Sequence, residues 1–144
     1  MKKTVRSLTV MVLFLLVAAV SVKAHCQIPC GIYDDQMRVT MMKEHVTTIE
    51  KSMKSIEAAQ DQNQTVRWVV NKEKHADELT EIVTYYFLAQ RIKPEKEHYE
   101  ANLKTLHQII VYSMKAKQTT DLKNVEKLKE LIRNLEQTYF GKKH

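Results

Sequence analysis

Apolar residues recur at every third or fourth position along four stretches of the chain that follow residue 34. In the first stretch they are Val39, Met42, Val46, Ile49, Met53 and Ile56. This spacing matches the 3.6-residue period of an α-helix and places the apolar side chains on one face. It predicts an amphipathic helix from about Asp35 to Ala59, which the polar segment 61–64 (Asp-Gln-Asn-Gln) then interrupts.

Three further helices are predicted in the same way. The second carries Trp68, Val69, Ala76, Leu79, Ile82, Val83 and Tyr86, and it ends before Pro94, because the residue preceding a proline avoids helical conformation. The third carries Tyr99, Leu103, Leu106, Ile110 and Met114. The fourth begins after the capping segment 119–121 (Thr-Thr-Asp), ends at Gly141, and carries Leu122, Val125, Leu128, Ile132, Leu135 and Tyr139.

Four amphipathic helices with short connections predict an all-α fold, an antiparallel four-helix bundle over residues 35–140. Composition supports this, since 2 Gly and 2 Pro in 144 residues are too few for a β-sandwich or a glycine-rich nucleotide loop. We expect Met42, Met53 and Met114 to fill the core. The single Glu-x-x-His at 95–98 falls short of the two pairs that a di-iron bundle needs.

Residues 1–24 have the pattern of a secretory signal peptide. Basic Lys2, Lys3 and Arg6 precede an apolar run, and small residues stand at positions −3 and −1 of a cleavage site after Ala24. The alternative is an uncleaved membrane anchor, but the apolar run of about 13 residues is shorter than the roughly 20 that a spanning helix needs. We therefore expect an exported protein, periplasmic or extracellular, with no membrane attachment after cleavage.

The formal net charge of +6 lies mostly in this leader. Removing its four basic residues from the total of 23 leaves 19 basic against 17 acidic side chains, a net charge of +2. This balance is too even for a protein that binds a phosphate backbone, so we expect no nucleic-acid partner. The 120 residues that remain suffice for one core, so residues 25–144 are expected to form a single domain.

Cleavage after Ala24 gives the chain a new N-terminus with a distinctive set of donors. The amine of His25, the backbone nitrogen and thiolate of Cys26, and the thiolate of Cys30 supply two nitrogens and two sulfurs. A planar set of this kind favours Ni(II) or Cu(II) over tetrahedral zinc, and the His25 imidazole remains as an axial ligand. Pro29 stiffens the segment, and Gly31 lets the backbone turn after the second cysteine.

A disulfide between Cys26 and Cys30 is the structural alternative, because these are the two cysteines of a chain expected to be exported. Cysteine count alone favours it. The position of His-Cys directly after the predicted cleavage site reverses that preference, since a disulfide has no use for an N-terminal histidine.

The segment from His25 to Tyr33 resembles the N-terminal metal hook of nickel-containing superoxide dismutases, whose pattern is His-Cys-x-x-Pro-Cys-Gly-x-Tyr. All six specified positions match. Shorter pieces of the later helices are similar in the same order: 71–76 (NKEKHA), 86–87 (YF), 93–94 (KP) and 106–108 (LHQ). The family carries a helical bundle on this hook, which agrees with the fold predicted above.

The resemblance implies the chemistry of the site. One nickel ion per subunit is bound by His25, Cys26 and Cys30 and cycles between Ni(II) and Ni(III), so that superoxide is disproportionated to dioxygen and hydrogen peroxide. His25 as axial ligand and Tyr33 over the open face of the metal have the catalytic roles. Selectivity for a small anion then comes from a narrow opening beside Tyr33. The family assembles as a homohexamer, which would shelter an exposed hook.

The chain departs from the family pattern at the residues that brace the N-terminal imidazole. The family uses a glutamate and an arginine. His75 falls at the arginine position, Thr40 or Met41 falls near the glutamate position, and Glu44 is the nearest acid on that helix. Gln27 also replaces the aspartate that many members carry after the first cysteine, which removes one negative charge from the hook.

Three other functions remain open at this point. An exported, non-catalytic nickel- or copper-binding bundle would use the same donors without turnover. An oxidative polysaccharide-cleaving enzyme also binds copper through an N-terminal histidine, but on a β-sandwich and without two thiolates. A structural bundle closed by a disulfide would bind no metal.

Overall fold

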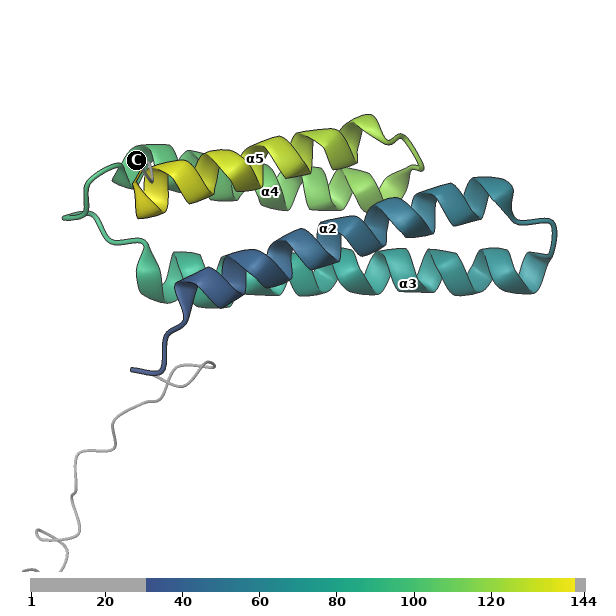
Figure 1. The fold of residues 1–144 in the computed structure, drawn as a ribbon, viewed down its shortest axis with the longest axis horizontal. Coiled ribbons are helices and arrows are strands. Elements are labelled where there is room, and N and C mark those ends of the chain that lie inside the picture. Colours follow the sequence, from purple (N-terminus) through teal and green to yellow (C-terminus); the bar gives the residue numbers. More distant parts are fainter. Residues whose placement is uncertain (1–30, 142–144) are drawn as a thin grey trace, which may run out of the picture. The chain divides into compact units, whose positions relative to one another are not determined.

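The computed structural model describes residues 31–141, so the predicted leader and the ligands His25, Cys26 and Cys30 lie outside the described residues. The described part consists of α2 (Asp35–Ala58), α3 (Gln62–Glu81), the π-helix η1 (Ile82–Arg91) that continues α3, α4 (Tyr99–Gln118) and α5 (Lys123–Phe140). These form four rods that run alternately in opposite directions (Figure 1). The predicted all-α, antiparallel four-helix bundle is confirmed.

Short polar side chains fix where the helices begin. Asp34 Oδ1 accepts a hydrogen bond from the backbone N–H of Met37 at 2.8 Å, and Asp61 Oδ1 accepts one from Asn63 at 3.1 Å. At the start of α5, Asp121 Oδ1 accepts from the Lys123 N–H at 3.0 Å, as the predicted cap requires. The expected break at 61–64 is wrong in part, because Gln62 to Gln64 already belong to α3, with Asp61 as its cap.

The core follows the predicted apolar stripe on α2. Its first five members are at most 1% exposed, and Ile56, near the helix end, is half-buried. The stripe of η1 is confirmed, with Ile82, Val83 and Tyr86 buried, and that of α5 is confirmed at Val125, Leu128, Ile132 and Leu135. Leu122, which was expected in the α5 stripe, precedes this helix and is 36% exposed. No helix among residues 31–141 is long and apolar enough to cross a membrane.

The stripe predicted for α4 is wrong in its orientation. Leu103 is 39% exposed and Met114 53% exposed, so Met114 is no core filler, and only Leu106 of the predicted set is buried. The buried face is shifted around the helix and consists of Asn102, Leu106, Ile109, Ser113 and Ala116.

The first turns of α3 also differ from the prediction. Val69 is 37% exposed and Trp68 is only half-buried, although both were expected in the core. The pair α2 and α3 extends further than the pair α4 and α5 at the end of the bundle that holds the 59–61 connection (Figure 1). Within residues 31–141, these turns of α3 therefore have α2 on one side and no helix that covers the other.

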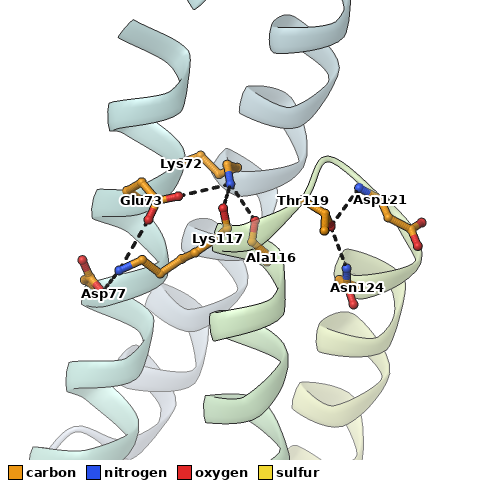
Figure 2. Close-up of polar contacts among 8 residues, drawn as sticks. All are labelled: Lys72, Glu73, Asp77, Ala116, Lys117, Thr119, Asp121 and Asn124. Carbon is orange, nitrogen blue, oxygen red and sulfur yellow. Dashed lines mark hydrogen bonds and ion pairs between the residues drawn. The ribbon is translucent and has the colours of Figure 1, made fainter. Parts of the chain in front are cut away.

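A buried lysine marks the point where α4 ends beside α3. Lys72 is 3% exposed, and its ammonium donates hydrogen bonds to the carbonyls of Ala116, at 2.8 Å, and Lys117 (Figure 2). Its charge also faces the Glu73 carboxylate at 3.2 Å. The last carbonyls of a helix lack partners within the helix and carry partial negative charge, so a cation there is stabilising.

We expect Lys72→Met to lower the free energy of unfolding by about 2 kcal/mol, because the two carbonyls and the carboxylate lose their buried donor. Chemical denaturation followed by circular dichroism measures the change. Lys104→Met, at an exposed position of α4, is the matched control and should stay within about 0.5 kcal/mol of the wild type. Equal effects of the two substitutions would contradict this role for Lys72.

Candidate active site

Of the four predicted site residues, Tyr33 is the one that the described part of the chain contains; the placement of His25, Cys26 and Cys30 stays a prediction. The segment between the hook and α2 begins with Gly31, whose φ of +84° lies in the left-handed region that favours glycine. This agrees with the turn expected after Cys30. Tyr33 follows two residues later and precedes the cap of α2 at Asp34.

Tyr33 lies against the end of η1. Its ring meets the ring of Tyr86 edge-on, with centroids 6.0 Å apart, and the Arg91 guanidinium carbon lies 4.4 Å from its centroid. Both contacts are of attractive types, an aromatic pair and a cation–π contact. The ring is nevertheless 39% exposed, so one side is anchored and the other faces outward.

The Tyr33 hydroxyl is directed at the side chain of Gln90. It donates to Gln90 Oε1 at 3.3 Å, and Gln90 is held in turn by its Nε2, which donates to the Tyr85 carbonyl at 2.9 Å. Gln90 is 8% exposed, so its amide is a fixed acceptor. A length of 3.3 Å is long for an O–H···O bond, so the hydroxyl can leave Gln90 and donate to another acceptor at low cost.

Beneath Tyr33 a single carboxylate joins three helix ends. Asp35, in the first turn of α2, accepts hydrogen bonds from Tyr86 at 2.5 Å and from Tyr139 of α5 at 2.8 Å. Arg91 donates hydrogen bonds to both oxygens of Asp35, from Nε to Oδ1 at 2.9 Å and from Nη2 to Oδ2 at 2.7 Å. A bidentate pair of this kind is strong and directional. It positions Arg91 under the ring of Tyr33.

The π-helical form of η1 contributes to this arrangement. Its bonds run from residue i to residue i+5, as in the bond from the Ile92 N–H to the Phe87 carbonyl at 2.9 Å. Residues five apart are therefore neighbours on adjacent turns. Tyr86 and Arg91 are five apart, and both reach the same carboxylate.

The ionisation of the network follows from these contacts. Burial raises the pKa of Asp35, but hydrogen bonds from Arg91, Tyr86 and Tyr139 outweigh it and hold the pKa below its ordinary value of 3.8. Burial and the hydrogen bond to Asp35 raise the pKa of Tyr139 to about 12 and raise that of Tyr86 further. The network is therefore an anionic carboxylate among neutral phenols and one guanidinium at neutral pH.

A cleft of about 840 Å³ lies on another side of this network. It is lined by Asp35, Arg91, the 92–99 segment and the end of α5, and Tyr33 is not among its lining residues. The outward face of Tyr33 is thus separate from that hollow. This is consistent with an active site that is not a deep pocket in the bundle.

The family of the chain follows from comparison with known proteins. A family model described as nickel-containing superoxide dismutase matches residues 20–143, which is most of the chain. The chain belongs to this family. Comparisons with curated proteins and with solved structures found no match.

The protein is accordingly a nickel superoxide dismutase, an oxidoreductase whose substrate is superoxide and whose metal is nickel. Of the functions left open by the sequence, the family selects the enzyme over the non-catalytic carrier, the copper polysaccharide enzyme and the metal-free bundle.

Sequence reasoning on the dismutase missed two groups of residues. One is the network of Asp35, Tyr86, Arg91 and Tyr139, whose members are up to 104 positions apart. The other is a group formed by His45, His75 and Glu78. For the second group the spacing His75-x-x-Glu78 on one helix face was a usable signal.

We expect Asp35→Asn to destabilise the dismutase at pH 7 by about 2 kcal/mol, because the Arg91 cation loses its partner. The wild-type carboxyl has a depressed pKa in the folded state, so its contribution is present above the unfolded value near 3.8 and is lost as pH falls through the folded value. The difference between the two proteins should therefore shrink below about pH 4.

Chemical denaturation at pH 7 and at pH 3 measures both effects. Glu97→Gln is the control, since the Glu97 side chain is 87% exposed. A gap between wild type and Asp35→Asn that is the same at both pH values would refute the ionic role of Asp35.

Proposed function

We propose that the dismutase binds one nickel ion per subunit at an N-terminal hook, through His25, Cys26 and Cys30, and disproportionates superoxide there. The observation that carries this proposal is the segment His25 to Tyr33, which matches every specified position of the family's hook pattern. Two superoxide anions and two protons give one dioxygen and one hydrogen peroxide. Bound nickel would supply the one-electron exchange by alternating between Ni(II) and Ni(III).

The donor set fits nickel on chemical grounds. The thiolates of Cys26 and Cys30 would be soft anionic ligands for nickel, and the amine of His25 and the backbone nitrogen of Cys26 would add two nitrogen donors. Anionic sulfur and amidate donors favour the higher oxidation state, and the His25 imidazole would supply a further nitrogen donor. The set requires a free amine, so it requires that the chain begin at residue 25.

Tyr33 is proposed to order water or the incoming anion at this site. Its ring is anchored by Tyr86 and Arg91, while its hydroxyl donates to Gln90 through a long bond. With the hydroxyl directed at Gln90, its oxygen accepts from a water molecule on the open side. When an anion approaches, the hydroxyl can turn and donate to it, because little is lost by breaking a 3.3 Å bond.

Formation of the active site is proposed to depend on export and processing. Signal-peptide cleavage after Ala24 exposes His25, and the protein then acts in the periplasm or outside the cell. Tyr33, at the end of the hook motif, is 39% exposed in the single chain. We propose that neighbouring subunits of a homohexamer cover the hook.

We expect one extra residue before His25 to abolish more than about 99% of superoxide turnover while the helical content stays unchanged, because the amine becomes a second peptide amide and the proposed set loses its one amine donor. Pulse radiolysis and bound-nickel analysis measure the loss, and N-terminal mass determination defines each sample. An Ala extension after the C-terminal His144 is the matched control. Full turnover with a blocked N-terminus would overturn the proposal.

Tyr33→Phe should keep nickel and the fold but lower turnover by about 10-fold, the scale of losses when a residue next to metal ligands is changed. The ring contacts to Tyr86 and Arg91 remain in this variant, so the loss isolates the hydroxyl. Tyr85→Phe is the control, because Tyr85 is exposed and its contact to Gln90 is through its backbone. Unchanged turnover in Tyr33→Phe would exclude a role for the hydroxyl.

A further inference from the structure

Three metal-ligating side chains converge between α2 and α3, well away from the start of α2. His45 Nδ1 lies 2.8 Å from His75 Nδ1, and Glu78 Oε2 lies 3.5 Å from the first nitrogen and 3.4 Å from the second. His45 is on α2, ten residues after Asp35, which corresponds to about 15 Å along the helix. His75 and Glu78 are three residues apart on α3 and so share a face.

These three atoms form a triangle of the size that one zinc ion requires. Zinc binds histidine nitrogen and carboxylate oxygen at about 2.0–2.1 Å in tetrahedral geometry, which places neighbouring ligand atoms about 3.3–3.4 Å apart. Two sides of the triangle, at 3.4 and 3.5 Å, match this spacing. The third, at 2.8 Å, is a hydrogen bond between the two imidazoles and needs to open by about half an ångström.

The surroundings leave room for a fourth ligand and orient the carboxylate. The side chains of His45, His75 and Glu78 are 13%, 24% and 36% exposed, so the site is partly enclosed and open to water on one side. The Lys74 ammonium lies 3.7 Å from Glu78 Oε1, which leaves Oε2 directed at the histidines. Neighbouring groups that orient a ligand in this way are typical of metal sites.

The state of the histidines is compatible with metal binding. The 2.8 Å contact between the two Nδ1 atoms requires one imidazole to be an acceptor and therefore neutral at that nitrogen. Burial lowers the pKa of His45, while Glu78 acts in the opposite direction. Neutral imidazole is the form that binds metals.

We propose that His45, His75 and Glu78 form a second metal site, which takes Zn²⁺ with water as its fourth ligand and ties α2 to α3. Two imidazoles and one carboxylate with an open position are a donor set that zinc accepts. The site shares no ligand with the nickel hook. Zinc binding there can therefore be measured separately from nickel binding by the hook, although His75 falls at the position where the family carries the arginine that braces the N-terminal imidazole.

The test is a Zn²⁺ titration of purified protein whose hook already contains nickel. We expect one zinc ion per chain by calorimetry and metal analysis, and a rise in melting temperature of at least about 5 °C in excess zinc. His45→Gln, His75→Gln and Glu78→Gln should each weaken zinc binding by at least about 100-fold. His107→Gln, at an exposed histidine on α4, should bind zinc like the wild type.

Two further measurements test the site even if one of the variants fails to fold. In wild-type protein, added Zn²⁺ should shift the ring nitrogen resonances of His45 and His75 and leave those of His107 unchanged. Co²⁺ in place of Zn²⁺ should give the intense visible absorption of a tetrahedral site, and this absorption should be lost in Glu78→Gln.

The outcomes separate this inference from the proposed function. In Cys26→Ser/Cys30→Ser, nickel and turnover should be lost while zinc binding remains. If the hook binds no nickel but zinc still depends on the three residues, the proposed function fails and the second site stands. Zinc that is not bound, or that is bound equally by the three variants, overturns the second site.

Discussion

The geometry around Tyr33 depends on one carboxylate. Asp35 accepts hydrogen bonds from two phenols and from both sides of one guanidinium. These donors belong to η1 and to the end of α5, while Asp35 is the first residue of α2. Three rods are therefore joined at the end of the bundle from which residues 31–33 emerge (Figure 1). Arg91 and Tyr86 also contact the ring of Tyr33, so a displacement of Asp35 that moves them would also shift this ring, which is proposed to face superoxide.

Much of the fold could be predicted because the apolar stripes of α2, η1 and α5 are regular and their capping residues are recognisable. The orientation of α4 could not be predicted, because its buried face includes the polar residues Asn102 and Ser113. A search for regularly spaced apolar residues does not detect such positions. The exposure of Val69 also had no local signal. It depends on how far α4 extends beside α3, and α4 ends where its last carbonyls accept from Lys72.

For the active site, the metal-binding motif could be predicted from sequence, but the residues that support Tyr33 could not. The hook could be proposed from a short, ordered motif, because its donors are adjacent in sequence, and its placement remains a prediction since residues 25–30 lie outside the described part. The support beneath Tyr33 could not be predicted. Asp35, Arg91 and Tyr139 come together only when helices far apart in the chain are packed, and the π-helical spacing of η1 has no clear signature in its residues.

The distribution of methionines has a consequence for an enzyme that releases hydrogen peroxide. Met37 and Met114 are 46% and 53% exposed, whereas Met42 and Met53 are fully buried. Peroxide converts thioethers to sulfoxides, which disrupts packing when the sulfur lies in a core. Within residues 31–141, the exposed methionine sulfurs lie on the surface of α2 and α4, so they can react with oxidant while the interior of the bundle keeps its sulfur reduced.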